Sequence, residues 1–235
     1  MNTEIIKSKV LQSFRCVLND ESLYLLLTKS SFDIFLCGGF VRNVILGMNN
    51  SFNDIDLFFQ CKDYELSFFV KEISNYGEVK LGPFGAPRLF LKDKKIGYID
   101  IVPFSCFKVS KNPISDINQL LVNFDFTANA IGLSLKEKIL YDPLNALSDI
   151  DNKILRAVRL DFPDKKVALN ISLSTLSVFW FRLLTYQYKL DFNFDENTYR
   201  WICQNKFRYD DLKLFEKYFF KPEFSRSILK EMNLA

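Results

Sequence analysis

The segment LCGGFVRNVILGMNNSFNDIDL (residues 36–57) decides the fold, because it joins a glycine turn, a helix and an acidic strand. Gly38 and Gly39 follow an apolar strand expected over 34–37 and would form a tight turn that opens a helix. The backbone N–H groups of such a turn can hold a triphosphate, and the helix dipole favours negative charge there. The first half of the segment therefore predicts an anion site.

Two carboxylates follow in the same segment. Asp54 and Asp56 are one residue apart in a strand expected over 54–60. Because side chains alternate along a strand, both carboxylates project from one face and can share divalent cations. Arg42 lies one turn into the expected helix and could bind phosphate oxygens at several points. Together these residues predict a metal site directed at phosphates.

The composition removes several classes of enzyme. The chain has 235 residues, of which 49% are hydrophobic and 25% charged, which is ordinary for a soluble globular protein. It contains no histidine, which excludes hydrolase triads with a His base and His-ligated zinc sites. Carboxylates must therefore carry any acid–base or metal chemistry.

The cysteines and apolar runs bear on location. The five cysteines are widely spaced and form no Cys-x-x-Cys pair, which argues against a disulfide framework or a zinc cluster. The N-terminal segment lacks the apolar core of a signal peptide, and no apolar run approaches the roughly 18 residues of a membrane span. We expect a soluble, cytoplasmic protein with no membrane partner.

The net charge of +3 is unevenly distributed. Residues 1–150 contain 16 Lys and Arg against 17 Asp and Glu, whereas 151–235 contain 15 against 11. The basic surplus of the C-terminal part permits contact with nucleic acid without demonstrating it, because solvated helix faces have similar compositions.

Hydrophobic periodicity predicts the order of the elements. We expect a helix over 3–28 with a break at Asn19-Asp20, a helix from the glycine turn to Leu46, and a helix over 64–77. Further predictions, in chain order, are strands over 86–92 and 98–104 joined across 93–95, a helix over 116–130, a hairpin over 131–143, a turn entering a helix over 142–158, and helices from 172 onward.

Three ordered segments resemble one known family. They are GGFVRN…LG…DIDLF (38–58), VNFDFTANAIGL (122–133) and YDPLNALSDIDNKILRAV (141–158). They resemble the tRNA CCA-adding enzymes and bacterial poly(A) polymerases, class II of the polymerase-β-like nucleotidyltransferases, over about residues 20–160. The resemblance implies an α+β fold: a catalytic head over 1–150, with a small mixed β-sheet flanked by helices, and an all-helical, neck-like region over 151–235.

The resemblance also implies roles for residues. Asp54, Asp56 and Asp100 would be the catalytic carboxylates and would bind Mg²⁺ or Mn²⁺. A hydroxyl, for example an RNA 3′-OH, would attack the α-phosphate of an NTP and release pyrophosphate.

The nucleotide would be bound by a second group of residues. Gly38, Gly39 and Arg42 would hold the triphosphate. Asp125 and Asn129 match positions near the nucleotide sugar, although helix capping or a local hydrogen bond would explain them equally well. Asp142, Asp149 and Arg156 match a head–neck segment and are expected to be structural.

Several positions depart from the family pattern. The acid that normally follows Arg42 is Asn43, two arginines are replaced by Asn123 and Phe124, and a third is replaced by Ser105. The family's base-selecting Glu-Asp-x-x-Arg motif falls near 175–179, where no acid or arginine remains. The sequence therefore predicts neither base selection by that motif nor specific CCA addition.

Three functions remain open. The first is a metal-dependent, poly(A) polymerase-like or tRNA-processing nucleotidyltransferase that acts on an RNA 3′ end, with tRNA as one candidate and a protein partner supplying RNA-binding surface. The second is a toxin- or defence-type transferase that modifies tRNA or a protein hydroxyl. The third is a degenerate module that binds RNA or protein.

Overall fold

The computed structural model describes residues 2–48, 54–82, 85–92, 96–107, 113–168 and 171–234. The chain divides into two compact units. The first comprises Met1–Phe124 with Asn129–Ala146, and the second comprises Asp125–Ala128 with Leu147–Ala235. The predicted α+β class is confirmed, since the first unit is a mixed sheet flanked by helices and the second is mostly helical.

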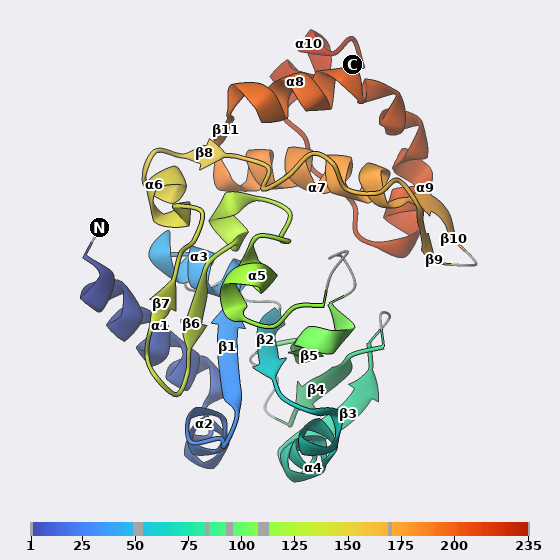
Figure 1. Ribbon diagram of the computed structural model, residues 1–235. Helices are drawn as coiled ribbons and strands as arrows, with labels where there is room; N and C mark the ends of the chain where they lie inside the picture. The colour runs from blue at the N-terminus through green and yellow to red at the C-terminus, as the bar shows by residue number, and fades with distance from the viewer. Residues whose placement is uncertain are drawn as a thin grey trace. The chain divides into compact units, whose positions relative to one another are not determined.

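A seven-stranded sheet organises the first unit (Figure 1). Its strand order is β3 (Gly77–Leu81), β4 (Pro87–Leu91), β5 (Tyr98–Pro103), β2 (Asp54–Gln60), β1 (Asp33–Cys37), β6 (Gly132–Ser134) and β7 (Leu140–Tyr141). Within the described residues of this sheet, β2 and β5 are parallel and the other neighbouring strands are antiparallel. Because β1 and β2 run in opposite directions, Cys37 at the end of β1 lies opposite Asp56 near the start of β2.

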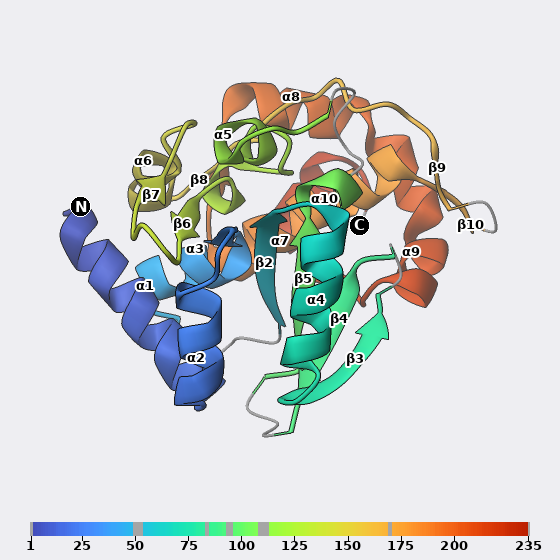
Figure 2. The ribbon, with the colours of Figure 1, turned by 60° about the horizontal axis from the view of Figure 1, so that its bottom comes forward.

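Among the described residues of this unit, the helices that accompany the sheet are α1 (Thr3–Leu18), α2 (Glu21–Thr28), α3 (Gly39–Ile45), α4 (Asp63–Ile73) and α5 (Ile117–Leu121). The predicted break at Asn19-Asp20 is confirmed, because Asn19 adopts a left-handed conformation and Asp20 caps α2. Figure 2 shows α4 near β2, and its Phe69 ring lies 5.2 Å from the ring of Phe59. Aromatic packing therefore anchors α4 at the far end of β2 from the acidic residues.

The second unit is built on α7 (Thr175–Leu190), whose Phe181 ring lies 4.7 Å from Phe215 in the unit's core. Its other helices are α6 (Ala146–Asp151), α8 (Glu196–Gln204), α9 (Leu212–Tyr218) and α10 (Arg226–Glu231), with a 3₁₀ turn over Lys206–Asp211. Its described residues also form short strands that the helical prediction did not include: β8 (Ile154–Leu155), β9 (Lys166–Ala168), β10 (Ile171–Ser174) and β11 (Asn193–Phe194).

Three predicted helices are too long. The helix expected over 64–77 ends at Ile73, whereas the other two end where a distant segment pairs with the chain. The helix expected over 116–130 ends at Leu121, because Phe126 forms a bridge with Ala157 instead of continuing the helix. The helix expected at the end of 142–158 stops at Asp151, after which Lys153 is left-handed and β8 pairs with β11. In both places a pairing with a distant segment overrides local helix propensity. The predicted turn at 93–95 lies outside the described residues.

Candidate active site

The glycine turn follows β1 directly. Gly38 has φ +71° and ψ −135°, a conformation that side chains disfavour, and it caps α3. Its N–H donates to the carbonyl of Ile131 at 3.2 Å. A Cβ atom at this position would lie 3.6 Å from Oδ2 of Asp56 and 3.6 Å from the ring of Phe124. The turn is therefore next to an acidic side chain of β2.

The three predicted carboxylates lie on the parallel pair β2 and β5. Ile55 is fully buried, while Asp54 is exposed and Asp56 half-buried on the other face of β2. The register places Asp56 opposite Asp100, and Asp54 opposite Tyr98. The strand pairing thus brings two carboxylates side by side with a third two residues away.

Arg88 is a residue that sequence analysis missed at this site. It lies opposite Asp100 in the β4–β5 register, and its guanidinium donates to both oxygens of Asp100 at 2.6 and 2.9 Å. Hydrogen bonding to Asp100 raises the pKa of Arg88. The signal in the sequence was an arginine in an expected strand next to the strand of Asp100, but the register that pairs them could not be read.

Tyr98 connects Arg88 to Asp54. The Arg88 guanidinium carbon lies 3.7 Å from the centre of the Tyr98 ring, and the Tyr98 hydroxyl donates to Oδ2 of Asp54 at 3.3 Å. Burial, followed by the charge of Asp54, raises the pKa of Tyr98 to about 12. The hydroxyl therefore remains a donor at neutral pH.

Arg42 lies inside the first unit. Its side chain is 4% exposed, and its guanidinium donates to Oδ1 of Asn43 at 2.8 and 3.1 Å and to Oδ1 of Asn129. The structure therefore brings together Arg42 and Asn129, two of the predicted nucleotide-binding residues. Asn43, which replaces the family's acid, provides neutral acceptor oxygen for Arg42.

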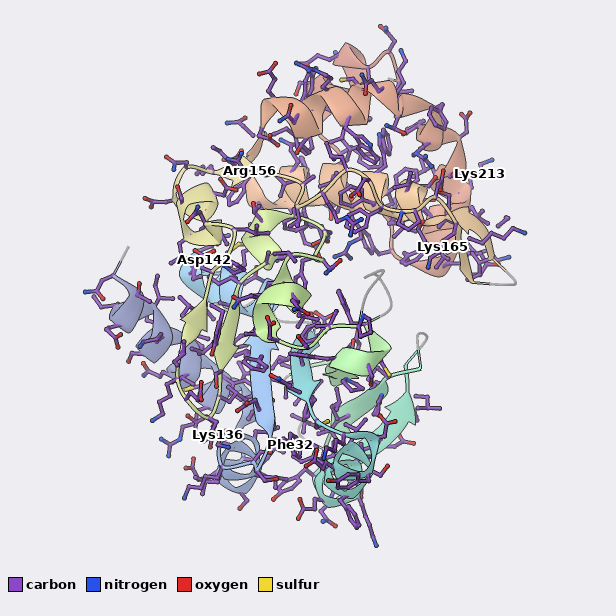
Figure 3. All side chains as sticks on the ribbon, in the orientation of Figure 1. Phe32, Lys136, Asp142, Arg156, Lys165 and Lys213 are labelled. Atoms are coloured by element: carbon purple, nitrogen blue, oxygen red, sulfur yellow. The ribbon has the colours of Figure 1, made fainter. Side chains whose placement is uncertain are left out.

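The second unit holds Asp125 in an ion pair. Its Oδ2 accepts from Arg182 of α7 at 2.6 and 2.9 Å, and its Oδ1 accepts from the N–H of Phe126 at 3.0 Å. Asp149 is buried and accepts from the Thr127 hydroxyl and from two nitrogens of Arg156, which is labelled in Figure 3. The hydrogen bonds of Asp149 to Thr127 and Arg156 are structural contacts within the second unit.

Asp142 follows β7 in the first unit (Figure 3) and accepts from the N–H of Ala146 at 2.5 Å. This bond closes the turn that leads into α6. Asp142 therefore also has a structural contact.

The start of α7 contains the positions 175–179, where sequence analysis found no acid or arginine. Ser177 donates to Asp211 at 2.5 Å and accepts from Arg208 at 3.2 Å. Arg208 also pairs with Asp164 at 3.0 Å. An acid and an arginine thus lie beside this segment but come from other elements, which local sequence comparison could not reveal.

The donor set bears on metal binding. Carboxylate oxygens suit Mg²⁺, which commonly binds through one or two carboxylates together with substrate phosphates. Asp54 and Asp56 fit this requirement, whereas both oxygens of Asp100 are engaged by Arg88. Within the described ranges, no cluster of three or more His, Cys, Asp or Glu side chains is placed to hold an ion. None of the described helices is long and apolar enough to span a membrane.

Comparison with known proteins gives one family and one fold. The sequence model described as Gabija anti-defense 2 family protein matches residues 4–153. No curated protein matches the chain.

Three solved structures illustrate the fold. The Thermotoga maritima CCA-adding enzyme complexed with tRNA has 20% identity and a TM-score of 0.65, with 93% of this chain and 53% of that chain covered. A CCA-adding enzyme with CTP has 22% identity and a TM-score of 0.63, covering 90% and 50%. A tRNA nucleotidyltransferase with a primer tRNA and an ATP analogue has 20% identity and a TM-score of 0.57, covering 90% and 54%. The chain shares this fold and spans about half the length of these proteins.

Proposed function

We propose, from the premise that the chain belongs to the Gabija anti-defense 2 family, that it counters this defence as a metal-dependent nucleotidyltransferase. The reaction is transfer of a nucleotidyl group from an NTP to an RNA 3′ end, with release of pyrophosphate. We propose residues 1–150 as the catalytic head and 151–235 as a helical, neck-like domain. We also propose a protein partner that contributes RNA-binding surface.

The observation that carries this proposal is the position of the acidic strand beside the glycine turn. Asp54 and Asp56 share one face of β2. Oδ2 of Asp56 lies 3.6 Å from the position that a Cβ atom would take at residue 38. A turn without side chains lets a phosphate group approach the backbone closely. This arrangement combines a surface for anions with ligands for the cation that accompanies them.

Each residue has a defined task in the proposed reaction. Asp54 and Asp56 would hold Mg²⁺ or Mn²⁺, which when bound neutralises phosphate charge and favours attack by the hydroxyl. Gly38, whose N–H already donates to Ile131, and Gly39 would let the triphosphate approach the backbone closely, and Arg42 would hold α3 in place through Asn43 and Asn129. The nucleotide roles of Arg42, Asp125 and Asn129 and the metal role of Asp100 stay predictions.

The proposal is tested by incubating the protein with each α-labelled NTP, Mg²⁺ and total RNA. The Asp54→Asn/Asp56→Asn variant should lose label transfer by about a hundredfold or more, because the charge that holds the metal is gone. Asp63→Asn/Glu72→Gln is a matched control, since it removes the same charge from exposed positions of α4. Equal labelling by the wild type and the acidic-strand variant would refute the proposed reaction.

The anti-defence family favours a second candidate, transfer to a protein hydroxyl. The same assay with extract from cells that carry the Gabija system separates the two acceptors. Label that resists ribonuclease and is removed by protease would identify a protein acceptor. Label at RNA ends, located by sequencing, would support the first candidate.

A further inference from the structure

Arg88 and Asp100 form a two-point ion pair on neighbouring strands. The donor–acceptor distances are 2.6 and 2.9 Å, and the two side chains are 20% and 18% exposed. A guanidinium binds carboxylates and phosphates through the same planar pair of N–H donors. Arg88 is therefore a cation that suits both Asp100 and a phosphate group, at a position that water reaches.

Arg88 also acts on the rest of the acidic strand. It stacks on Tyr98, which donates to Asp54, and the charge of Asp54 is among the causes that raise the pKa of Arg88 after the dominant hydrogen bond to Asp100. Three carboxylates on two adjacent strands repel one another unless a cation is present. The guanidinium supplies that positive charge in the protein without metal.

The pair differs from the structural ion pairs of the second unit. Asp149 accepts from Thr127 as well as from Arg156, and Asp125 accepts from a backbone N–H as well as from Arg182. Among the described residues, both hydrogen bonds that Asp100 accepts come from Arg88. Asp100 would thus be available to another cation if Arg88 moved.

We propose that Arg88 is an exchangeable counter-ion that also binds phosphate. In the resting protein it occupies Asp100; when a divalent cation enters with a nucleoside triphosphate, the cation takes Asp100 and Arg88 turns to the triphosphate. This inference rests on the proposed function for the identity of the nucleotide. It supplies a positive charge that Asn123, Phe124 and Ser105 cannot provide.

The first test measures binding of Mn²⁺ alone by electron paramagnetic resonance. Arg88→Gln should bind Mn²⁺ roughly tenfold more tightly than the wild type, because the competing cation is gone. Asp100→Asn alone should change Mn²⁺ affinity by less than about twofold, because Arg88 already occupies this carboxylate in the wild type. In the Arg88→Gln background, the same substitution should remove the roughly tenfold gain in Mn²⁺ affinity.

The second test measures binding of α,β-methylene ATP in the presence of saturating Mn²⁺. Arg88→Gln should weaken nucleotide binding roughly tenfold. Arg88→Lys should give an intermediate loss of affinity, because lysine keeps the charge but lacks the planar pair of N–H donors. Arg15→Gln is the matched control, since Arg15 forms an exposed two-point pair with Glu21 on α1 and α2. This control should change neither affinity. Arg88→Lys also provides the answer if Arg88→Gln fails to fold.

The outcomes separate the two proposals. Unchanged Mn²⁺ and nucleotide affinities in folded Arg88→Gln or Arg88→Lys would overturn the role of Arg88, even if the wild type transfers nucleotides. An Mn²⁺ gain that persists in Arg88→Gln/Asp100→Asn would also overturn it, because the competition would not be for Asp100. The expected affinity changes in a protein without transferase activity would support Arg88 and refute the proposed function.

Discussion

Two arginines of the first unit, Arg42 in α3 after the glycine turn and Arg88 on β4 beside the acidic strands, are held in different ways. Arg42 is 4% exposed and donates to the neutral amide oxygens of Asn43 and Asn129. Arg88 is 20% exposed and pairs with the carboxylate of Asp100. A buried guanidinium that donates to amide oxygens anchors the fold, whereas a partly exposed one on a carboxylate can exchange partners with a ligand. The comparison teaches that burial, more than residue type, distinguishes the two roles.

The largest expected effect comes from breaking the anchor. Arg42→Gln should lower the free energy of unfolding by about 3 kcal/mol, because it leaves buried amide oxygens without their charged donor. Arg88→Gln should cost only about 1 kcal/mol, since water reaches that pair. Urea unfolding of both variants measures the difference. An equal loss of unfolding free energy in both variants would contradict the distinction between the two arginines.

A smaller effect is expected from the glycine turn itself. Gly38→Ala should destabilise the protein by about 2 kcal/mol through backbone strain at φ +71°. It should also reduce nucleotide transfer, because the added methyl group would lie 3.6 Å from Asp56. Gly47→Ala is the control, with φ +73° and open space around its Cβ position. That variant should lose about 1 kcal/mol and retain transfer. Equal transfer by both variants would contradict a role for the turn.

The smallest effect concerns Tyr98. Its pKa in the folded protein is about 12, above the ordinary value of 10.0, so the folded state holds the phenolic proton more tightly. The resulting stability is fully present below pH 10 and is lost as the pH rises from 10 to 12. We expect Tyr98→Phe to flatten this decline by at most about 1 kcal/mol, because the ring is only partly buried and solvent screens Asp54. Unfolding curves of both proteins across this range test the sign, and a steeper decline in the variant would contradict it.

Local patterns were sufficient for much of the fold and part of the site. The glycine pair predicted a turn because few other residues adopt the conformation of Gly38. Alternation predicted β2 with the observed limits and placed Asp54 and Asp56 on one face. Apolar runs likewise predicted β1, β4 and β5. These features depend on residues close together in the chain, so local sequence patterns are enough to predict them.

Local sequence patterns could not predict the pairings between distant segments. The helix expected over 116–130 ended early because Phe126 pairs with Ala157, and the end of the helix expected over 142–158 was instead β8, paired with β11. In each case the backbone hydrogen bonds are satisfied by a segment far along the chain, which no local propensity specifies.

By itself, the sequence determined which residue types are present and in what order: a glycine pair before a helix, two carboxylates one residue apart on a strand, and no histidine. Only the tertiary structure decided which acceptor each arginine meets, because the β4–β5 register sets Arg88 on Asp100 and the packing of the first unit sets Arg42 on Asn129. A side chain's charge is a property of the residue, whereas its partner depends on strand register and packing.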